Sequence, residues 1–309
     1  MNRILIQQIL REAISRCLPK PAAASLNAGA EAIYNSSAAA AIKQEIIRVG
    51  RKLWERQYVD GNGGNISYRI AREYVICTPT MCSKGDLTPD DLSLIDLENE
   101  RLCGERPHTS EVLLHLEIYK AVPQARAVIH CHPPHATAYA ITGLLPPGNV
   151  IPEQEVFVGP MAVTPYETPG TKEFAMTVLP YVRNHNTILL GNHGIVCWAD
   201  TVTHAEWLVE IVDTYCRTIM LASSLSGPVK SLDADKVTDL LEIKKKLGWP
   251  DSRLAEQGGV PNRPFLADDA CGDEASARGV RAAGISQQQI EDLVSKMTDQ
   301  VIELLSKKE

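Results

Sequence analysis

Apolar residues recur along the chain at two spacings. Between residues 37 and 58 they recur at helical spacing, at Ile42, Ile46, Leu53 and Trp54, which predicts a helix with one buried face. Further helices are expected at residues 111–121, 134–141, 171–182 and 201–223, and strands at residues 65–69, 74–78, 92–97, 187–190 and 195–198. Because helices and strands mix throughout, the sequence predicts an α/β fold whose sheet is covered by helices on both faces.

The two ends of the chain carry a different pattern. Near the C-terminus, helical spacing is followed by Ile290, Leu293, Val294, Met297, Val301, Leu304 and Leu305. A shorter stripe lies within residues 1–18, and the residues that follow it, 19–30, are typical of a linker. We therefore expect four parts: an amphipathic helix and linker (1–36), a central domain (37–248), a second linker (249–284) and a C-terminal amphipathic helix (285–309).

Composition narrows the function classes. The formal net charge of −7 and the lack of a basic face argue against nucleic-acid binding. We expect no membrane association, since no apolar run is long enough to cross a bilayer and no secretory leader is evident. The eight cysteines contain no C-x-x-C pair, so a reducing cytoplasm is the expected location.

Two histidines separated by one residue, His130 and His132, end an apolar run that begins at Ala127. Side chains at alternate positions of a strand point the same way, so both imidazoles could hold one ion. Glu111 opens the helix before this strand, and His193 lies between two later apolar runs. Imidazole and carboxylate ligands suit a divalent transition metal, with zinc the first choice, although each histidine alone would more often be a hydrogen-bonded structural residue.

A glycine-rich turn, residues 61–65, precedes the first expected strand. Closely spaced glycines let backbone N–H groups approach an anion, and Asn65 adds a side-chain donor. Ordinary hairpin turns have the same composition, so the turn alone is weak evidence. Thr109 and Ser110 fit an anion site independently, because hydroxyls and free amides at a helix N-terminus favour negative charge.

Five segments occur in an order that resembles the class II aldolase and adducin family. They are Gly-Asn-Gly-Gly-Asn-Ile-Ser-Tyr-Arg at 61–69, Thr-Pro-Thr-Met-Cys-Ser-Lys-Gly at 78–85, Thr-Ser-Glu at 109–111, His-Cys-His-Pro at 130–133 and Asn-His-Gly at 192–194. The likeness covers about residues 37–248. It implies a three-layer αβα sandwich with a largely antiparallel or mixed sheet, and a homotetramer with active sites between subunits.

The resemblance also implies the site. One Zn²⁺ per subunit would be bound by Glu111, His130, His132 and His193. The substrate phosphate would be held by Asn62, Gly64, Asn65, Thr80, Met81, Thr109 and Ser110. Met81 departs from the Gly or Ser that is usual in the family, so the phosphate pocket is expected to be altered.

The implied activity is zinc-dependent cleavage of a ketose 1-phosphate, L-fuculose 1-phosphate or L-rhamnulose 1-phosphate, to dihydroxyacetone phosphate and L-lactaldehyde. Glu111 would also be the base for the carbon-bound proton of dihydroxyacetone phosphate, and its presence favours the aldolases over the epimerases, in which Asp is expected. A dehydratase acting on a methylthio-sugar phosphate and a non-catalytic, adducin-like binding module are the alternatives; a pure scaffold should purify without stoichiometric zinc.

The group that handles the proton of the leaving aldehyde stays open. Two tyrosines do this in the fuculose-type aldolases, but by register their places fall near Val156 and Leu247. The other candidates are Glu153, Glu155, Tyr166 and Trp249, and the sequence does not choose among them.

The terminal segments resemble the encapsulation peptides that carry enzymes into bacterial microcompartments. Shell proteins are accordingly expected partners, and the location would be cytoplasmic inside such a compartment. The alternative is that either helix docks on its own domain or on a neighbouring subunit.

Overall fold

The computed structural model describes residues 23–255 and residue 298. The chain divides into two compact units, one of residues 30–268 and a smaller one of residues 1–29 and 269–309. The sheet and the candidate site belong to the larger unit. The amphipathic segments expected at residues 1–18 and 285–309 lie outside the described residues except for Thr298, so the encapsulation hypothesis stays a prediction.

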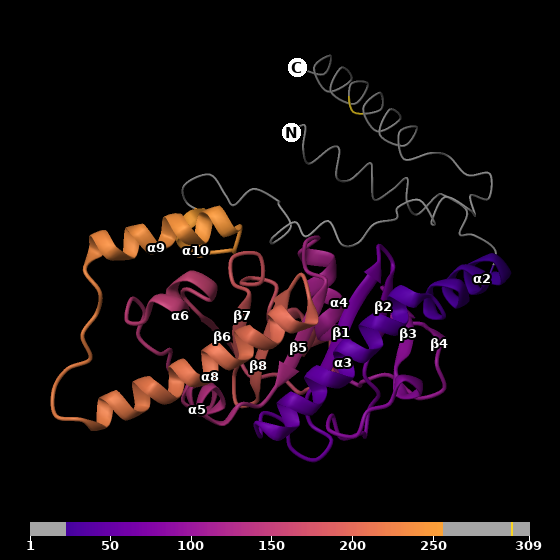
Figure 1. Cartoon of the computed structure of the whole chain (residues 1–309), viewed down its shortest axis with the longest axis horizontal. Helices are drawn as coiled ribbons and strands as arrows, with labels where there is room; N and C mark the ends of the chain where they lie inside the picture. The colour runs from indigo at the N-terminus through magenta and orange to yellow at the C-terminus, as the bar shows by residue number, and fades with distance from the viewer. Residues whose placement is uncertain (1–22, 256–297, 299–309) are drawn as a thin grey trace, which may run out of the picture. The chain divides into compact units, whose positions relative to one another are not determined.

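The larger unit is built around a mixed sheet of eight strands (Figure 1). Their order is β4 (Arg101–Cys103), β3 (Ser93–Asp96), β2 (Tyr74–Cys77), β1 (Asn65–Ala71), β5 (Ala127–Cys131), β8 (Gly194–Ala199), β7 (Thr187–Leu190) and β6 (Ala162–Thr164). Neighbouring strands are antiparallel except β6 and β7, which are parallel. The expected mixed sheet is confirmed. The hydrophobic pattern does not predict β4 and β6, because three residues are too few to show alternation.

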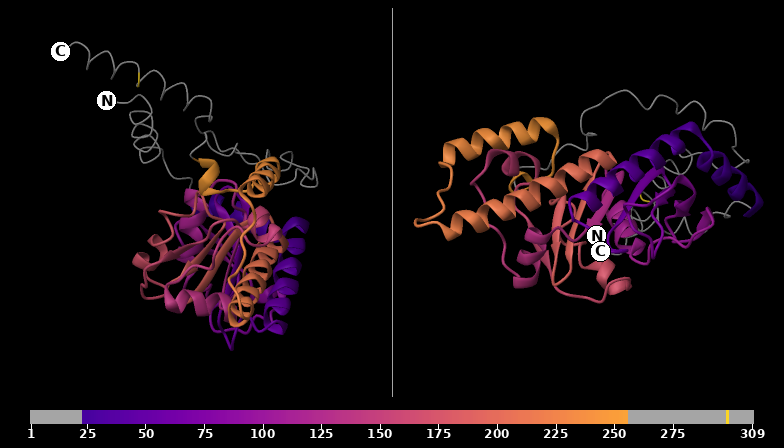
Figure 2. Two further views of the ribbon diagram at one scale, coloured as in Figure 1. Left: turned by 90° about the vertical axis from the view of Figure 1, so that its left-hand side faces the viewer. Right: turned by 60° about the horizontal axis from the view of Figure 1, so that its bottom comes forward.

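Helices flank this sheet on both faces, as the two views of Figure 2 show. The helices are α2 (Ala23–Tyr34), α3 (Ser37–Glu55), α4 (Val112–Ala121), α5 (Pro134–Thr142), α6 (Pro152–Phe157), α7 (Lys172–Met176), α8 (Val202–Ser224), α9 (Ala234–Leu247) and α10 (Ser252–Ala255), with a 3₁₀ turn η1 (Pro89–Asp91). None of those within residues 23–255 combines the length and apolar character that a bilayer crossing requires. The αβα class predicted from the sequence is confirmed.

Helices α3 and α8 cover one face of the sheet, where α3 packs on β1 and α8 packs on β5 and β8 (Figure 1). Helix α4 covers the opposite face. Ser67 of β1 points toward α4 and bonds to His115 and Tyr119, whereas Ile66 and Tyr68 point the other way because side chains alternate along a strand. The strand ends that carry the candidate ligands are therefore held between two helical layers.

Helix α3 shows how the sequence produces one of these layers. Ser36 is its N-cap, and its side chain accepts a hydrogen bond from the backbone N–H of Ala39. Ile46 and Leu53 are fully buried, as the periodicity predicts. Trp54 belongs to the predicted apolar face, yet 49% of it is exposed in this structure, because it lies beyond the edge of the buried face.

The helix expected at residues 171–182 is shorter than predicted. Helix α7 ends at Met176, and turns occupy residues 177–184. Pro180 explains this difference, since a proline inside a helix lacks the N–H that a helical hydrogen bond needs and its ring collides with the preceding turn. Apolar residues of this segment are still buried, among them Val178 and Val182.

The linkers expected to flank the central domain begin and end elsewhere. Residues 23–34 form α2, although residues 19–30 have the composition of a linker. Trp249 and Asp251 are buried, although the second linker was expected to begin at residue 249. The packed domain therefore continues to at least Leu254, and the rest of that predicted linker lies outside the described residues.

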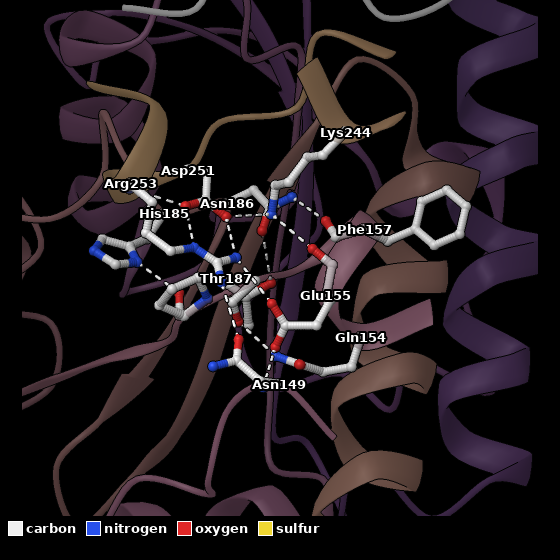
Figure 3. Close-up of polar contacts among 12 residues, drawn as sticks. Asn149, Gln154, Glu155, Phe157, His185, Asn186, Thr187, Lys244, Asp251 and Arg253 are labelled. Atoms are coloured by element: carbon white, nitrogen blue, oxygen red, sulfur yellow. Dashed lines mark hydrogen bonds and ion pairs between the residues drawn. The ribbon is translucent and has the colours of Figure 1, made fainter. Parts of the chain in front are cut away.

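A buried group of charges holds this C-terminal part in place (Figure 3). Lys244 Nζ lies 3.1 Å from Asp251 Oδ2, and both side chains are fully buried. Arg253 binds Asp251 through Nε and Nη2, each at 2.9 Å, and its Nη2 also lies 2.9 Å from Glu155 Oε2 of α6. A side chain at Gly159 would collide with Asp251 and Lys244, so a glycine is required there. These contacts join α9 and α10 to α6.

We predict that Asp251→Asn lowers the free energy of unfolding by about 3 kcal/mol, because it leaves the buried ammonium of Lys244 without its counter-charge. Lys244→Met should lower the free energy of unfolding by a smaller amount, because Asp251 keeps both hydrogen bonds from Arg253. Urea unfolding followed by circular dichroism measures both. Lys245→Met is the matched control, because its exposed side chain should change stability by no more than about 0.5 kcal/mol. Equal losses in Asp251→Asn and Lys245→Met would contradict the prediction.

Candidate metal centre and active site

The two histidines of the His-x-His motif lie at the end of β5. His130 belongs to the strand and is fully buried, and His132 directly follows it. Their Nε2 atoms lie 3.1 Å apart, so both rings turn toward one point as the alternation of a strand predicts. The backbone N–H of His132 donates to Tyr58 O at 2.8 Å, which fixes the chain just past the strand.

His193 reaches the same point from the turn between β7 and β8. Strand β8 pairs with β5, and its Ile195 lies opposite Cys131, so the register of the sheet places this turn beside the histidine pair. The ring of His193 is centred 4.6 Å from that of His130 and 5.1 Å from that of His132. One nitrogen of each of these rings lies within 4.8 Å of the other two, a spacing that one metal ion can bridge.

Glu111 completes the group from the N-terminus of α4. Its Oε2 lies 3.3 Å from His130 Nε2, and its Oε1 lies 3.5 Å from His193 Nε2. The structure therefore brings together all four ligands that the sequence suggested, although Glu111 and His193 are separated by more than eighty residues in the chain.

Hydrogen bonding and burial set the protonation of these rings. His130 Nδ1 must donate to Ile195 O at 2.8 Å, because a carbonyl can only accept, so a neutral His130 carries its lone pair on Nε2. Burial, together with the neighbouring His132 and His193, holds the pKa of His130 well below 6.5. Burial first, and then His132, lowers the pKa of His193 to about 4. Neutral imidazole is thus the favoured form of both at pH 7.

The donor set fits a divalent cation. His130 Nε2 presents a lone pair to His132 Nε2 across 3.1 Å, so the two atoms are joined either by the N–H of a neutral His132 or by a shared cation, and burial opposes a positive charge on His130. Three imidazoles and one carboxylate are ligands that suit zinc in four-coordinate or open catalytic sites. Burial raises the pKa of Glu111, opposed by the Asn65 hydrogen bond, His132 and Lys84, which gives this carboxyl group a stronger affinity for a proton than an exposed glutamate has.

A chain of buried hydrogen bonds orients Glu111. Asn65 Nδ2 donates to Glu111 Oε2 at 2.8 Å, and Asn65 Oδ1 lies 2.6 Å from His115 Nε2. His115 Nδ1 lies 2.6 Å from Ser67 Oγ, which is 2.7 Å from the hydroxyl of Tyr119. The family resemblance predicts that Asn65 is one of the phosphate ligands. In this structure its amide faces the carboxylate and the interior instead, so its role is to position Glu111.

The other expected phosphate residues lie on two loops that are tied to each other. Thr109 N donates to Thr78 O at 3.0 Å, and Thr80 N donates to Pro107 O at 3.1 Å. Thr109 is buried, whereas Ser110 is exposed. These bonds bring the 78–81 and 107–110 loops together directly before Glu111.

The glycine turn contributes the remaining phosphate candidates. Asn62 Nδ2 lies 3.2 Å from Met81 Sδ, so the turn meets the 78–81 loop. Met81 is 77% exposed and has a positive φ of 51°, a conformation that Gly or Asn adopts at less cost. Gly64 also has a positive φ, and a side chain there would collide with Val59 and His130 O. Its glycine is therefore required by backbone packing next to the metal ligands.

Lys84 is a residue of this site whose role the sequence does not reveal. It is 1% exposed, and its ammonium donates to Asn62 O at 2.9 Å and to Cys82 O at 2.6 Å. Burial lowers its pKa to about 8, while Cys82 and Glu111 act in the opposite direction. A lysine between Ser83 and Gly85 is expected to be exposed, because its neighbours in the sequence are small and polar. Its burial beneath the glycine turn depends on the folded structure.

The four candidates for the proton of the leaving group fall into two kinds. Glu155 is buried and is bound by Arg253 and by the backbone N–H of Asn149, and Trp249 is buried beside Phe157. Glu153 and Tyr166 are exposed. Glu155 and Trp249 therefore belong to the packing of the C-terminal part rather than to an open site.

Comparison with known proteins agrees with this geometry. Residues 44–220 match the family model of the Class II Aldolase and Adducin N-terminal domain. The chain belongs to this family. The matched residues include β1, α4, β5 and the β7–β8 turn, on which the four candidate ligands lie.

Three relatives indicate the range of activities in the family. The chain is 36% identical over 203 residues to a 3-oxo-tetronate 4-phosphate decarboxylase of Haemophilus influenzae, covering 64% of this chain and 95% of that protein. It is 34% identical over 182 residues to an L-fuculose phosphate aldolase of Methanococcus maripaludis, covering 59% and 97%. A solved structure of an L-fuculose 1-phosphate aldolase aligns with a TM-score of 0.61 at 29% identity, covering 67% of this chain and 96% of that one.

We predict that the metal-free class II aldolase domain loses stability as the pH falls below 6.5. Burial lowers the pKa of His115 from 6.5 to about 3. Between pH 6.5 and pH 3 the unfolded chain therefore binds a proton at this histidine, whereas the folded chain does not. Each such histidine contributes up to about 1.4 kcal/mol per pH unit in that window. His115→Gln should make urea-derived stability fall less steeply between pH 6 and pH 5, by about that amount. Parallel curves for the two proteins would refute the assignment.

Substitution of the ligands should remove the metal. In His132→Ala, bound zinc measured by elemental analysis after dialysis is expected to fall from about one ion per chain to nearly none, because one imidazole is lost from the centre. Asn65→Leu should lower zinc affinity by about 10-fold to 100-fold, since it frees Glu111. His135→Ala is the matched control, because its Nδ1 bonds to Asp213. Full zinc occupancy in His132→Ala would remove this residue from the ligand set.

Proposed function

We propose that this protein is a metal-dependent carbon–carbon lyase that decarboxylates a phosphorylated 3-oxo sugar acid of the 3-oxo-tetronate 4-phosphate type. Two considerations support the proposal. One is the similarity to decarboxylases with that activity. The other, which carries the choice, is that tyrosines are lacking at the expected positions, and that Glu155 and Trp249, the buried candidates near them, are occupied in packing.

The expected chemistry begins at the metal centre. A divalent cation, zinc first, bound by Glu111, His130, His132 and His193 would polarise the substrate ketone and stabilise the enediolate negative charge that bond cleavage leaves. The hydroxyl of Thr109 and the exposed Ser110 lie at the N-terminus of α4, where free amides favour the substrate phosphate. Glu111 follows directly in the chain, so the phosphate and the carboxyl group would be held at a fixed separation.

Glu111 would deliver or remove the proton at the substrate carbon. Burial raises its pKa, so it binds a proton more readily than an exposed glutamate, and Asn65 fixes its orientation. After carbon dioxide leaves, protonation of the enediolate carbon by Glu111 would yield dihydroxyacetone phosphate.

The leaving group separates decarboxylation from aldol cleavage. Carbon dioxide departs from a carboxylate that is already ionised, so no protein group has to handle a proton on that side. An aldehyde departs only if its hydroxyl loses a proton, which needs a base close to that oxygen. Val156 and Leu247 occupy the register of the tyrosines that would do this, and Glu155 and Trp249 are buried in packing contacts.

Aldol cleavage of L-fuculose 1-phosphate or L-rhamnulose 1-phosphate is the second candidate. The 34% identity to an archaeal L-fuculose phosphate aldolase favours it, and the same metal centre and Glu111 would serve it. A non-catalytic binding module is the least favoured reading, because a module without chemistry has no need of a complete ligand set held by buried hydrogen bonds.

Purified full-length protein, loaded with zinc, tests the choice. Carbon dioxide release from 3-oxo-tetronate 4-phosphate should exceed L-lactaldehyde release from either ketose 1-phosphate by at least about 100-fold in kcat/KM, because only the first reaction proceeds without a base at the leaving group. Glu111→Gln should lower kcat by about 10²-fold to 10⁴-fold. Zinc content is measured on the same samples, so that loss of chemistry is separated from loss of metal. Faster lactaldehyde release would overturn the assignment in favour of the aldolase.

A further inference from the structure

A basic hollow lies toward the end of β1 that is remote from the metal centre. Its volume is about 560 Å³, and its lining includes four cationic side chains, those of Arg69, Arg72, Lys120 and Arg126, against one carboxylate, that of Glu73. Asn65, which bonds to Glu111, begins β1, whereas Arg69 lies near the end of this strand. Four residues of a strand span about 13 Å, and the lining of the hollow includes none of the residues expected to hold the substrate phosphate.

Within the described part of the chain the arginines of this hollow lack counter-charges, whereas Lys120 Nζ lies 3.3 Å from Glu117 Oε1. Arg69 donates to the carbonyl oxygens of Tyr119, at 3.0 Å, and of Pro123, and Arg126 donates to Ile70 O at 3.5 Å. Among the residues that the structure describes, no carboxylate lies within ion-pair distance of Arg69, Arg72 or Arg126. Their positive charge is therefore available to a ligand.

Two aromatic rings hold the guanidinium groups in position. The guanidinium carbon of Arg69 lies 5.4 Å from the ring centre of Tyr119, and that of Arg126 lies 5.3 Å from the ring centre of Tyr68. Burial lowers the pKa of Arg69, and Arg126 adds to this effect because the two charges repel. Like charges held together in this way cost free energy, and an anion bound between them would recover it.

We propose that this hollow binds a small phosphate-bearing metabolite. Guanidinium groups recognise the oxygens of a phosphate through paired N–H donors, and Arg72 and Lys120 are exposed and can close on it. The volume lies in the range of small-molecule sites. The net charge of −7 for the whole chain makes a nucleic acid a poor partner, because a phosphate backbone would be repelled by the excess of carboxylates.

Equilibrium dialysis of the zinc-loaded, full-length protein against radiolabelled inorganic phosphate, at constant ionic strength, tests the proposal. Wild type should bind one more phosphate per chain than Arg72→Ala/Lys120→Ala, in which affinity at the hollow falls at least tenfold. Both substituted side chains are exposed, so the variant should keep its fold, which circular dichroism verifies. The measurement does not depend on turnover, so failure of the proposed decarboxylase activity would leave it interpretable.

Arg183→Ala/Lys245→Ala is the charge-matched control, because it removes two exposed cations outside the hollow. It should bind phosphate as wild type does. Equal binding by wild type and Arg72→Ala/Lys120→Ala, or an equal loss in the control, would overturn the proposal. Succinate added in competition should displace the phosphate weakly; displacement as strong as that by unlabelled phosphate would show that the hollow selects negative charge rather than a phosphoryl group.

Discussion

Convergence of three imidazole rings and one carboxylate on a single point is the constraint on which the site depends. His130 and His132 present their Nε2 atoms to each other across 3.1 Å, and the bond from His130 Nδ1 to Ile195 O leaves the Nε2 lone pair of a neutral His130 directed at that point. Burial opposes a positive charge on His130. The register of β5 with β8 imposes this arrangement, since it brings His193 to the same point whatever the site contains. A divalent cation bound there would accept these lone pairs and balance the charge of Glu111, so the sheet supplies the geometry and the metal would add stability.

Periodicity in the sequence predicts part of the arrangement of the candidate metal ligands. Alternation along a strand placed His130 and His132 on one face, and the start of a helix placed Glu111 near them, because both are local properties of the chain. His193 was different. No local pattern joins it to the pair, and only the order of family motifs suggested that it belongs with them. The place of a residue next to a different strand depends on the register of the sheet. The spacing of residues within one segment gives no information about that register.

The orientation or burial of several polar side chains depends on tertiary contacts, which the sequence alone does not predict. Asn65 was expected to face a phosphate, but the direction of its amide is set by His115 and Glu111, which come some fifty residues later. The burial of Lys84 likewise depends on Asn62 and on the fold of its own loop. Composition around Trp249 indicates a linker, yet Lys244 and Arg253 hold Asp251 in the interior. In each case a polar side chain reads as exposed until its partner is known.

The packing of α6 against α9 is consistent with the proposed decarboxylation. Val156 lies on α6 and Leu247 on α9, near the places where the resemblance to the fuculose-type aldolases predicts tyrosines, and these two helices contact each other. Val156 is buried, and the Glu155 next to it is bound by Arg253. Side chains committed to packing cannot serve as acid or base at a departing aldehyde. A reaction whose leaving group is carbon dioxide makes no such demand, so these positions are free to stabilise the domain, whereas an aldolase would have to supply the missing base from another subunit.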